Sequence, residues 1–149
     1  IVPGIAIASD FIVGFPGETE GEFQDTMSLV RDLRFQNSFI FKYSPRPGTA
    51  AAKLSDDVPW ETKRRRNVEL LELQGAINLE ENRKFIGRHV EALVEGPSPR
   101  DPRRLTGRAR TNHIVVFESD EDLTGRLVTV RIESATHLTL AGVILGAEN

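Results

Sequence analysis

The first part of the chain alternates between the pattern of a buried strand and that of an amphipathic helix. Residues 5–14 are almost entirely apolar and rich in isoleucine and valine, which predicts a strand covered on both faces. Thr19 and Glu22 form a T-x-x-E capping box, so a helix should begin near Glu20. Residues 37–44 have the pattern of a second strand. A strand, a helix and a strand in succession form a βαβ unit, whose strands should be parallel.

Apolar stripes indicate how two helices should pack. The first helix carries apolar residues at spacings of three and four, which places them on one face toward the sheet. A second helix is predicted from Trp60 to about Phe85, with Pro59 at its first position. The expected stripes are Phe23, Met27, Val30 and Leu33 in the first helix, and Val68, Leu71 and Ile77, with Leu70 and Leu73 on a neighbouring row, in the second.

Four consecutive basic residues, 63–66, lie in the first turns of the second helix. The helix dipole disfavours positive charge at this end. We interpret the run as a solvated helix face, and a contact with a phosphate group is the alternative.

The predicted βαβ unit is incomplete as a sheet. Two parallel strands leave both edges unpaired, and one helix cannot cover both apolar faces. The unit is therefore either one piece of a larger sheet or a segment that needs a partner, and we favour the first reading. The chain begins with Ile1 rather than methionine, which suggests a trimmed chain or a fragment.

From Gly87 onward the hydrophobic pattern changes to a period of two, with turn residues between short runs. Five such runs predict a small antiparallel barrel of the size of oligonucleotide-binding domains. In the fourth run, Val128, Val130 and Ile132 occupy alternate positions and should face the interior. The expected strands are 89–95, 103–110, 113–118, 126–133 and 137–145.

Composition narrows the chemistry of the chain. A formal net charge of −3 argues against polyanion binding over the whole surface, but it permits a local basic patch. The absence of cysteine removes disulfides, thiolate nucleophiles and cysteine-held iron–sulfur clusters. The three histidines are too far apart in sequence to form a ligand motif. No apolar run approaches the roughly 18 residues of a membrane span, so we expect no membrane partner.

Residues 100–110 form a basic stretch with five arginines and one acidic residue, a local charge of +4. If this stretch is a strand, three of the arginines share one face because side chains alternate along a strand. Together with Asn112 in the following turn, this face offers donors to RNA phosphates and base edges. Phe117 is the only aromatic residue in the predicted barrel, so backbone contacts should dominate over base stacking. A solvated strand face is the alternative. The arginines of the shared face are Arg104, Arg108 and Arg110.

Two loops follow the predicted parallel strands at their carboxyl ends, where such folds bind ligands. In the first loop, Gly14 and Gly17 permit a close backbone approach and Pro16 stiffens the turn. In the second loop, Lys42 and Arg46 could meet a carboxylate or a phosphate. The alternatives are an ordinary strand-to-helix turn and a stiff proline-containing linker.

Three segments carry a resemblance to a known family. FIVGFPGET (11–19), FKYSPRPGTAAA (41–52) and LVEGPSPRDPRRLTGRARTNHIVVF (93–117) together resemble the C-terminal half of the radical S-adenosylmethionine methylthiotransferases. The resemblance implies an α/β plus all-β fold in three parts. Residues 1–55 would be the C-terminal portion of a TIM-like partial barrel, 56–85 a connecting helix, and 86–149 a five-stranded antiparallel TRAM barrel that binds RNA.

The resemblance also implies a function. The chain is most similar to members that methylthiolate C2 of N6-isopentenyladenosine next to the anticodon of tRNA. The family uses S-adenosylmethionine and two [4Fe–4S] clusters, and this chain has no cysteine to hold either cluster. We therefore expect a cytoplasmic fragment that is inactive alone and whose partners are tRNA and the missing N-terminal portion of the enzyme.

The site residues follow from the same resemblance. The first loop is similar to the radical-SAM segment G-x-I-x-G-x-x-E, which packs against adenine: Ile12 and Gly14 match, Asp10 replaces the leading glycine, and Glu18 stands one place late. No catalytic residue and no metal ligand is implied. The implied cofactor-binding residues are Ile12, Gly14, Phe15, Gly17, Glu18 and Tyr43. The implied RNA-binding residues are Lys42, Arg46, Arg100, Arg103, Arg104, Arg108, Arg110 and Asn112.

Two other hypotheses stay open from the sequence. The chain could be a stand-alone RNA-binding module with a vestigial front half. It could also belong to a methylthiotransferase that acts on threonylcarbamoyl-adenosine or on a ribosomal-protein aspartate.

Overall fold

The structure is a computed structural model of the chain and describes residues 5–147. Contacts divide it into two compact units, and the division falls inside a long helix, between Ile77 and Asn78. We call residues 6–77 the α/β unit and residues 78–147 the barrel unit. The predicted domain boundaries at residues 55 and 85 stay predictions, and their outer ends, 1–4 and 148–149, lie outside the described residues.

The α/β unit contains strand β1 (Ala8–Val13), helix α1 (Glu20–Leu33), strand β2 (Asn37–Lys42), the short 3₁₀ helix η1 (Ala51–Lys53) and most of helix α2 (Trp60–Arg83). The two strands pair in parallel, which confirms the βαβ prediction. Helix α1 begins with the predicted capping box: Thr19 accepts a hydrogen bond from the Glu22 amide, and the Glu22 carboxylate accepts one from the Thr19 amide.

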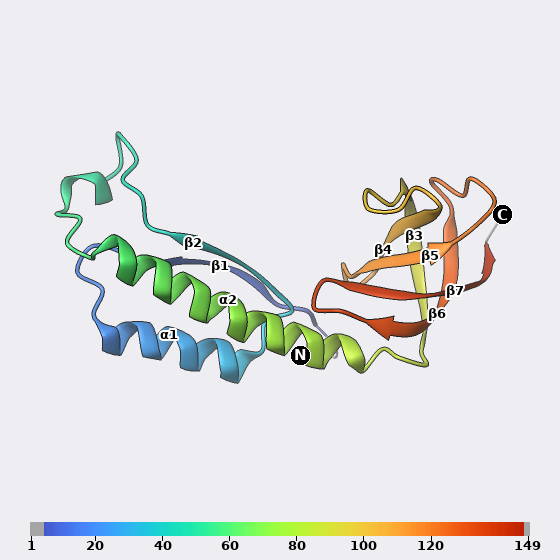
Figure 1. Cartoon of the computed structure of the whole chain (residues 1–149), viewed down its shortest axis with the longest axis horizontal. Coiled ribbons are helices and arrows are strands. Elements are labelled where there is room, and N and C mark those ends of the chain that lie inside the picture. The colour runs from blue at the N-terminus through green and yellow to red at the C-terminus, as the bar shows by residue number, and fades with distance from the viewer. Residues whose placement is uncertain (1–4, 148–149) are drawn as a thin grey trace. The chain divides into compact units, whose positions relative to one another are not determined.

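One face of the small sheet packs on both helices, and Figure 1 shows α1 and α2 on the same side of β1 and β2. The opposite face is open. Its apolar side chains are about half exposed, with 57% for Ile12, 59% for Phe39 and 54% for Phe41. The prediction that the first strand is covered on both faces is therefore wrong for the described residues, because both helices of the unit lie on one side of the sheet.

The predicted stripe of α1 is confirmed at Phe23, Met27 and Val30, which are buried. Leu33 is 50% exposed instead. The helix ends at this residue, and Arg34 turns the chain away in a left-handed conformation with φ of 49°.

The predicted stripe of α2 is partly wrong. Val68 and Leu71 are exposed, whereas Leu70 and Ile77 are buried. The side of the helix that packs on the α/β core also carries polar residues, so its apolar pattern is interrupted in the sequence. The buried row is Lys63, Arg66, Leu70, Gln74 and Ile77, at spacings of three and four.

The barrel unit contains five strands, as predicted, with ends that differ by at most two residues from the expected ones. They form a closed barrel in the order β3-β4-β5-β7-β6. The predicted all-antiparallel pairing is wrong at one seam, where β5 and β7 run parallel. A closed ring of five strands requires this, because an odd number of strands cannot alternate in direction all the way round. The strands are β3 (His89–Pro97), β4 (Arg104–Ala109), β5 (Ile114–Glu118), β6 (Leu127–Ala135) and β7 (Thr139–Ala147).

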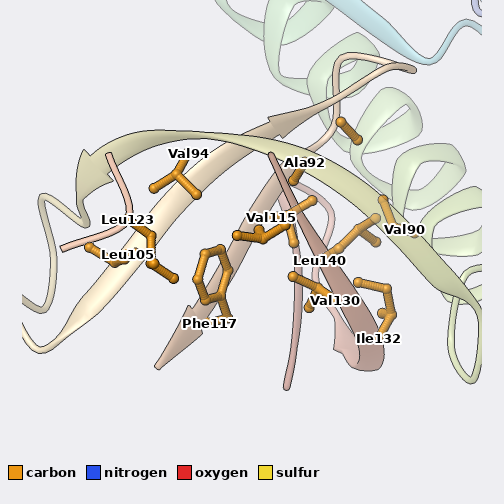
Figure 2. Close-up of a cluster of buried hydrophobic side chains, with 12 residues drawn as sticks. Val90, Ala92, Val94, Leu105, Val115, Phe117, Leu123, Val130, Ile132 and Leu140 are labelled. Carbon is orange, nitrogen blue, oxygen red and sulfur yellow. The ribbon is translucent and has the colours of Figure 1, made fainter. Parts of the chain in front are cut away.

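The barrel is filled by alternate side chains from every strand, and Figure 2 shows Phe117 pointing into this cluster among valine and leucine side chains. Val128, Val130 and Ile132 are buried, as predicted. Phe117 has no exposed surface, so it is not available to stack on a base. This corrects the expectation that Phe117 could contribute stacking. Within residues 5–147, no helix is long and apolar enough to cross a membrane.

Candidate functional site

A cavity of about 420 Å³ lies at the carboxyl ends of β1 and β2 in the α/β unit. Ile12 and Phe41 contribute its floor from the open face of the sheet, and Phe15 and Tyr43 come from the loops that follow the strands. The lining is completed by Asp10, Lys42, Ser44, Arg46, Thr49 and Ala51. The cavity therefore combines an apolar surface with a few charged and polar groups, as small-molecule sites do.

Two aromatic rings form a fixed corner of the cavity. The ring centroids of Phe15 and Tyr43 are 5.2 Å apart, with an angle of 70° between the ring planes. Such an edge-to-face pair is favourable beyond its buried area. The Tyr43 hydroxyl donates to the Ala51 carbonyl oxygen at 2.9 Å, and the Tyr43 amide donates to the Val13 carbonyl oxygen. These bonds hold the ring against β1 and η1.

Lys42 and Arg46 line the same cavity as the residues assigned to the cofactor. The Lys42 Nζ atom lies 5.2 Å from the ring centroid of Trp60, a cation–π distance. Arg46 is exposed at the rim. The structure thus brings together Ile12, Phe15, Tyr43, Lys42 and Arg46, and their ligands stay predictions.

Gly14, Gly17 and Glu18 are not among the residues that line this cavity. Gly14 is buried with a positive φ of 70°, and a side chain there would overlap Lys63. Gly17 has φ of 82° and donates its amide to Asp57 Oδ1 at 2.8 Å. Both positions therefore favour glycine, because the loop adopts positive φ angles there.

The Glu18 carboxylate points back into the protein. It accepts a hydrogen bond from the Gly14 amide and forms an ion pair with Arg66 at 3.1 Å. The side chains of Glu18 and Arg66 are 12% and 4% exposed. Arg66 also donates to the Glu18 carbonyl oxygen at 3.1 Å and to the Glu20 carboxylate at 3.2 Å. One guanidinium of α2 therefore holds the loop between β1 and α1.

Lys63, one turn earlier on α2, is buried in the same region. Its Nζ atom lies 2.5 Å from Asp56 Oδ1 and 5.1 Å from the ring centroid of Tyr43. The interpretation of residues 63–66 as a solvated face is thus wrong for Lys63 and Arg66, whereas Arg64 and Arg65 are exposed. Charged side chains are buried here because each has an acidic partner.

Arg65 interacts with the same loop from the exposed side of α2. It forms ion pairs with Glu20 at 2.6 Å and with Glu69 at 2.9 Å. The hydrogen bond from Arg65 lowers the pKa of Glu20 to about 2, with smaller contributions from Gln24 and Arg66. Glu20 is therefore ionised at neutral pH.

The roles of Lys63 and Arg66 were not predicted from the sequence. The signal that could have found them is their spacing of three, followed by Leu70 and Ile77 at spacings of four and seven along the same helical row.

The arginine stretch lies on the barrel unit. Arg104 and Arg108 are on β4 and point outward, since Leu105, Gly107 and Ala109 are the buried residues of that strand. Arg110 follows the end of β4 and lies in the turn to β5. The expectation that Arg110 shares a strand face with the other two is wrong, because β4 ends at residue 109.

Acidic side chains offset most of the local positive charge. Arg103 pairs with Asp101 at 3.1 Å, Arg108 with Glu95 at 3.4 Å, and Arg110 with Glu91 at 2.7 Å. The hydrogen bonds from Arg103 lower the pKa of Asp101. The charge of +4 counted along the sequence already includes Asp101, and Glu91 and Glu95 of β3 compensate half of it.

The remaining residues of the predicted RNA-binding set are Arg100 and Asn112, which lie in loops, and Arg104 of β4. Arg100 is exposed between β3 and β4. Asn112 has φ of 64° and donates its amide to the Ala109 carbonyl oxygen at 2.8 Å, which closes the β4–β5 turn. Arg104 forms no ion pair, and its buried Nε atom has no acceptor among the described residues.

No group of three or more histidine, aspartate or glutamate side chains in residues 5–147 is arranged to hold a metal ion. In the acidic turn at 120–122, the Asp122 carboxylate stabilises the turn itself, because its Oδ1 atom accepts a hydrogen bond from the Thr124 amide at 3.0 Å.

Comparison with known protein families identifies the kind of domain that the barrel unit is. Residues 83–145 match the TRAM domain family. The closed five-stranded barrel, which begins at His89, makes up most of this match, so the chain contains a TRAM domain.

The whole chain is similar to one kind of tRNA-modifying enzyme. It is 50% identical over 141 residues to the tRNA-2-methylthio-N(6)-dimethylallyladenosine synthase of Moorella thermoacetica, an alignment that covers 95% of this chain and 32% of that protein. It is 48% identical over 144 residues to the synthase of Carboxydothermus hydrogenoformans, covering 97% and 33% of the two chains. The synthase of Acidovorax sp. (strain JS42) is 49% identical over 151 residues, covering 99% and 33%.

These similarities confirm the resemblance to tRNA methylthiotransferases. The chain spans about a third of the length of the curated relatives that it matches.

Proposed function

We propose that this chain is the C-terminal part of a methylthiotransferase that modifies C2 of N6-isopentenyladenosine in tRNA. In this proposal the α/β unit supplies one wall of the S-adenosylmethionine pocket, and the TRAM barrel binds the tRNA. The substrate follows from the names of the relatives, which are synthases of 2-methylthio-N(6)-dimethylallyladenosine. A cytoplasmic location, where tRNA is modified, belongs to the same proposal.

The observation that carries the proposal is the cavity at the carboxyl ends of β1 and β2, on the face that the helices leave open. In a parallel α/β barrel the loops that follow the carboxyl ends of the strands bind the ligand. The half-exposed side chains of Ile12, Phe39 and Phe41 then face the interior of a barrel whose other strands lie on chain outside this sequence.

The residues of the cavity fit S-adenosylmethionine by their chemistry. Phe15, which is 40% exposed and packs on the buried Tyr43 ring, offers aromatic surface to an adenine ring, and Ile12 and Phe41 offer apolar surface. Lys42 and Arg46 can hold a methionyl carboxylate, and Asp10 can accept from an amino or a ribose hydroxyl group. When bound, S-adenosylmethionine supplies the methyl group and the radical chemistry of the family. Gly14, Gly17 and Glu18 shape the loop that carries Phe15.

The iron–sulfur clusters of the family do not fit this chain. A [4Fe–4S] cluster is held by cysteine thiolates, and the chain contains no cysteine. We therefore assign no cluster ligand to any residue here, and the complete enzyme would hold its clusters on the remaining two thirds of its length.

A chimeric enzyme tests the proposal directly. The C-terminal third of the Moorella thermoacetica synthase is replaced by this chain and expressed in a bacterial strain that lacks its own synthase. We expect 2-methylthio-N6-isopentenyladenosine to reappear in digested tRNA, measured by mass spectrometry of nucleosides. A chimera that is folded and carries its clusters but leaves N6-isopentenyladenosine unmodified would contradict the proposal.

A variant of the same chimera tests the cavity. Phe15→Ala removes one ring of the aromatic corner, and we expect the KM for S-adenosylmethionine to rise about tenfold, since an aromatic contact contributes about 1.4 kcal/mol. Leu29→Ala is the matched control, because Leu29 is an apolar residue that is 47% exposed on α1. Equal KM values for the two variants would remove Phe15 from the site.

Salt dependence tests the binding of tRNA by the barrel. The chain is expected to bind tRNA weakly, with log affinity falling linearly with log salt concentration. The triple replacement of Arg104, Arg108 and Arg110 with alanine should reduce this slope by about one unit for each phosphate group that the variant no longer neutralises. The measurement is fluorescence anisotropy of labelled tRNA between low and moderate salt.

A second triple variant controls for net charge. Arg31, Lys53 and Arg64 are exposed residues of the α/β unit, and their replacement with alanine removes the same three charges. We expect this variant to keep the wild-type slope. If both triple variants change the slope equally, the arginines of the barrel are not the docking surface.

A further inference from the structure

We infer that a groove beside Arg104 in the barrel unit is a subsite for one nucleobase of a bound RNA, and that its chemistry selects guanine. The inference rests on the proposed RNA-binding role of the barrel. The groove has a volume of about 280 Å³, near the lower end of the range of small-molecule clefts. It is lined by Arg104, Glu118, Glu133, Ser134, Ala141, Gly142 and Val143.

The strand pairing explains why a groove exists at this place. The parallel ladder between β5 and β7 ends at Phe117 and Gly142, whereas Glu118, the next residue of β5, pairs with Arg104 of β4. On the other side, the register between β6 and β7 shifts between Ile132 and Ser134, which leaves Glu133 as an extra residue. Bulges of this kind redirect a side chain and separate neighbouring strands.

Arg104 is the only arginine of the stretch that lines the groove, and it forms no ion pair among the described residues. Arg103, Arg108 and Arg110 each form an ion pair with a carboxylate. Arg104 forms none among the described residues, although Glu118 is its cross-strand neighbour. Its Nε–H donor is buried without an acceptor, and an unsatisfied buried donor in a native fold requires an explanation. A ligand that accepts from the guanidinium would supply it.

The neighbours of Arg104 favour a base edge over a phosphate. Two carboxylates line the same groove: Glu133 is paired with Arg131 at 2.8 Å, whereas Glu118 forms no ion pair among the described residues and would repel an anion. A guanine presents two adjacent acceptors, O6 and N7, to an arginine fork, and its N1–H and amino group are donors for a carboxylate. Adenine, cytosine and uracil do not combine this acceptor pair with such a donor pair. Val143, which is 45% exposed, offers an apolar surface to a planar ring in the groove.

The test measures binding of the whole 149-residue chain to three fluorescein-labelled RNA heptamers by anisotropy at one salt concentration. The heptamers are oligouridines whose central base is guanine, adenine or hypoxanthine, the base of inosine. We expect the guanine RNA to bind about tenfold more tightly than the adenine RNA, since a bidentate arginine contact discriminates by about that factor. The hypoxanthine RNA, which lacks the amino group, should fall between them.

Two variants connect the preference with Arg104. Arg104→Lys keeps the charge but loses the planar fork, so we expect it to keep its salt dependence and to bind the three RNAs with equal affinity. Arg103→Ala is the control, because Arg103 is 89% exposed and paired with Asp101, and this variant should keep the preference for guanine. Circular dichroism spectra establish that both variants are folded.

The outcomes separate the subsite from the proposed function. Wild-type chain that binds all three RNAs equally, or a guanine preference that survives in Arg104→Lys, would overturn the guanine subsite and leave RNA binding by the barrel in place. A chain that binds neither the heptamers nor tRNA would overturn the RNA-binding role itself, and the subsite with it.

Discussion

Replacing Arg66 with alanine is expected to lower the free energy of unfolding of the α/β unit by about 3–5 kcal/mol, because removal of one partner of a buried ion pair leaves the other charge uncompensated. The remaining partner is Glu18, whose side chain is 12% exposed. The variant also loses the hydrogen bonds from Arg66 to the Glu18 carbonyl oxygen and to Glu20. Trp60 is the only tryptophan of the chain and lies in this unit, so its fluorescence during urea denaturation reports the change.

Arg65→Ala is the matched control for this measurement. Arg65 is the preceding residue of α2, also pairs with Glu20, and is 46% exposed. Ion pairs at the surface contribute at most about 1 kcal/mol, so the control should change stability little. A second check combines Arg66→Ala with Glu18→Gln: since the two side chains are in contact, the double variant should lose less than the sum of the single losses. Equal losses for Arg66→Ala and Arg65→Ala would show that the buried pair does not hold the loop.

Replacing Gly142 with alanine is expected to destabilise the barrel unit by about 3 kcal/mol, at the upper end of the usual cost of overpacking. A Cβ atom at this position would overlap the backbone of β6 at Arg131 and Ile132. Both colliding groups are backbone, so the clash can be relieved only by separating β6 from β7. Hydrogen exchange of the β6 and β7 amides measures the loss, because these strands would open at a lower free energy.

Gly146→Ala provides the comparison on the same strand. No atom lies within 4 Å of a Cβ atom built at Gly146, so the added methyl group meets open space. We expect a change of less than about 0.5 kcal/mol, as for a surface substitution. If Gly142→Ala leaves the exchange rates of β6 and β7 as they are in Gly146→Ala, the close approach of the two strands is not a constraint on the fold.

Local patterns were sufficient for most of the secondary structure. The capping box at Thr19 and Glu22 begins α1 where expected, because both halves of that motif lie within four residues of each other. The alternating valines of β6 face the barrel interior for a similar reason, since the side of a strand is set by a period of two. The strand order could not be obtained in this way, and the parallel seam between β5 and β7 follows only from closure of the ring.

The helix α2 is the element that the sequence described least well. Its core-facing row contains Lys63, Arg66 and Gln74. Hydrophobicity predicts that such residues face water, and they are buried here because their partners come from distant parts of the chain: Glu18 precedes Arg66 by 48 residues, and the Phe35 carbonyl oxygen accepts from Gln74. A pattern read along one helix contains no information on those partners.

The candidate sites likewise have some features that the sequence predicts and others that depend on the fold. The loops at 14–18 and 43–46 were identified from the sequence, because glycine, proline and charged residues after a strand are local signals. Which residues face the cavity was decided by the fold, which turns Phe15 and Tyr43 toward it and Glu18 toward Arg66. Likewise the five arginines of 100–110 are visible in the sequence, whereas the ion pairs of Arg108 with Glu95 and of Arg110 with Glu91 depend on the pairing of β3 with β4.

By itself, then, the sequence determined that the chain has an α/β part and a β-barrel part, and which segments carry its chemistry. Strand and helix periods, caps and turn signals depend on residues close together in the sequence, so they can be recognised there. The tertiary structure decided which face of the small sheet stays open, which charges are buried in pairs, and that Arg104 alone among the β4 arginines has no carboxylate partner among the described residues. Those properties arise from contacts between residues far apart in the chain, and only the folded backbone brings such residues together.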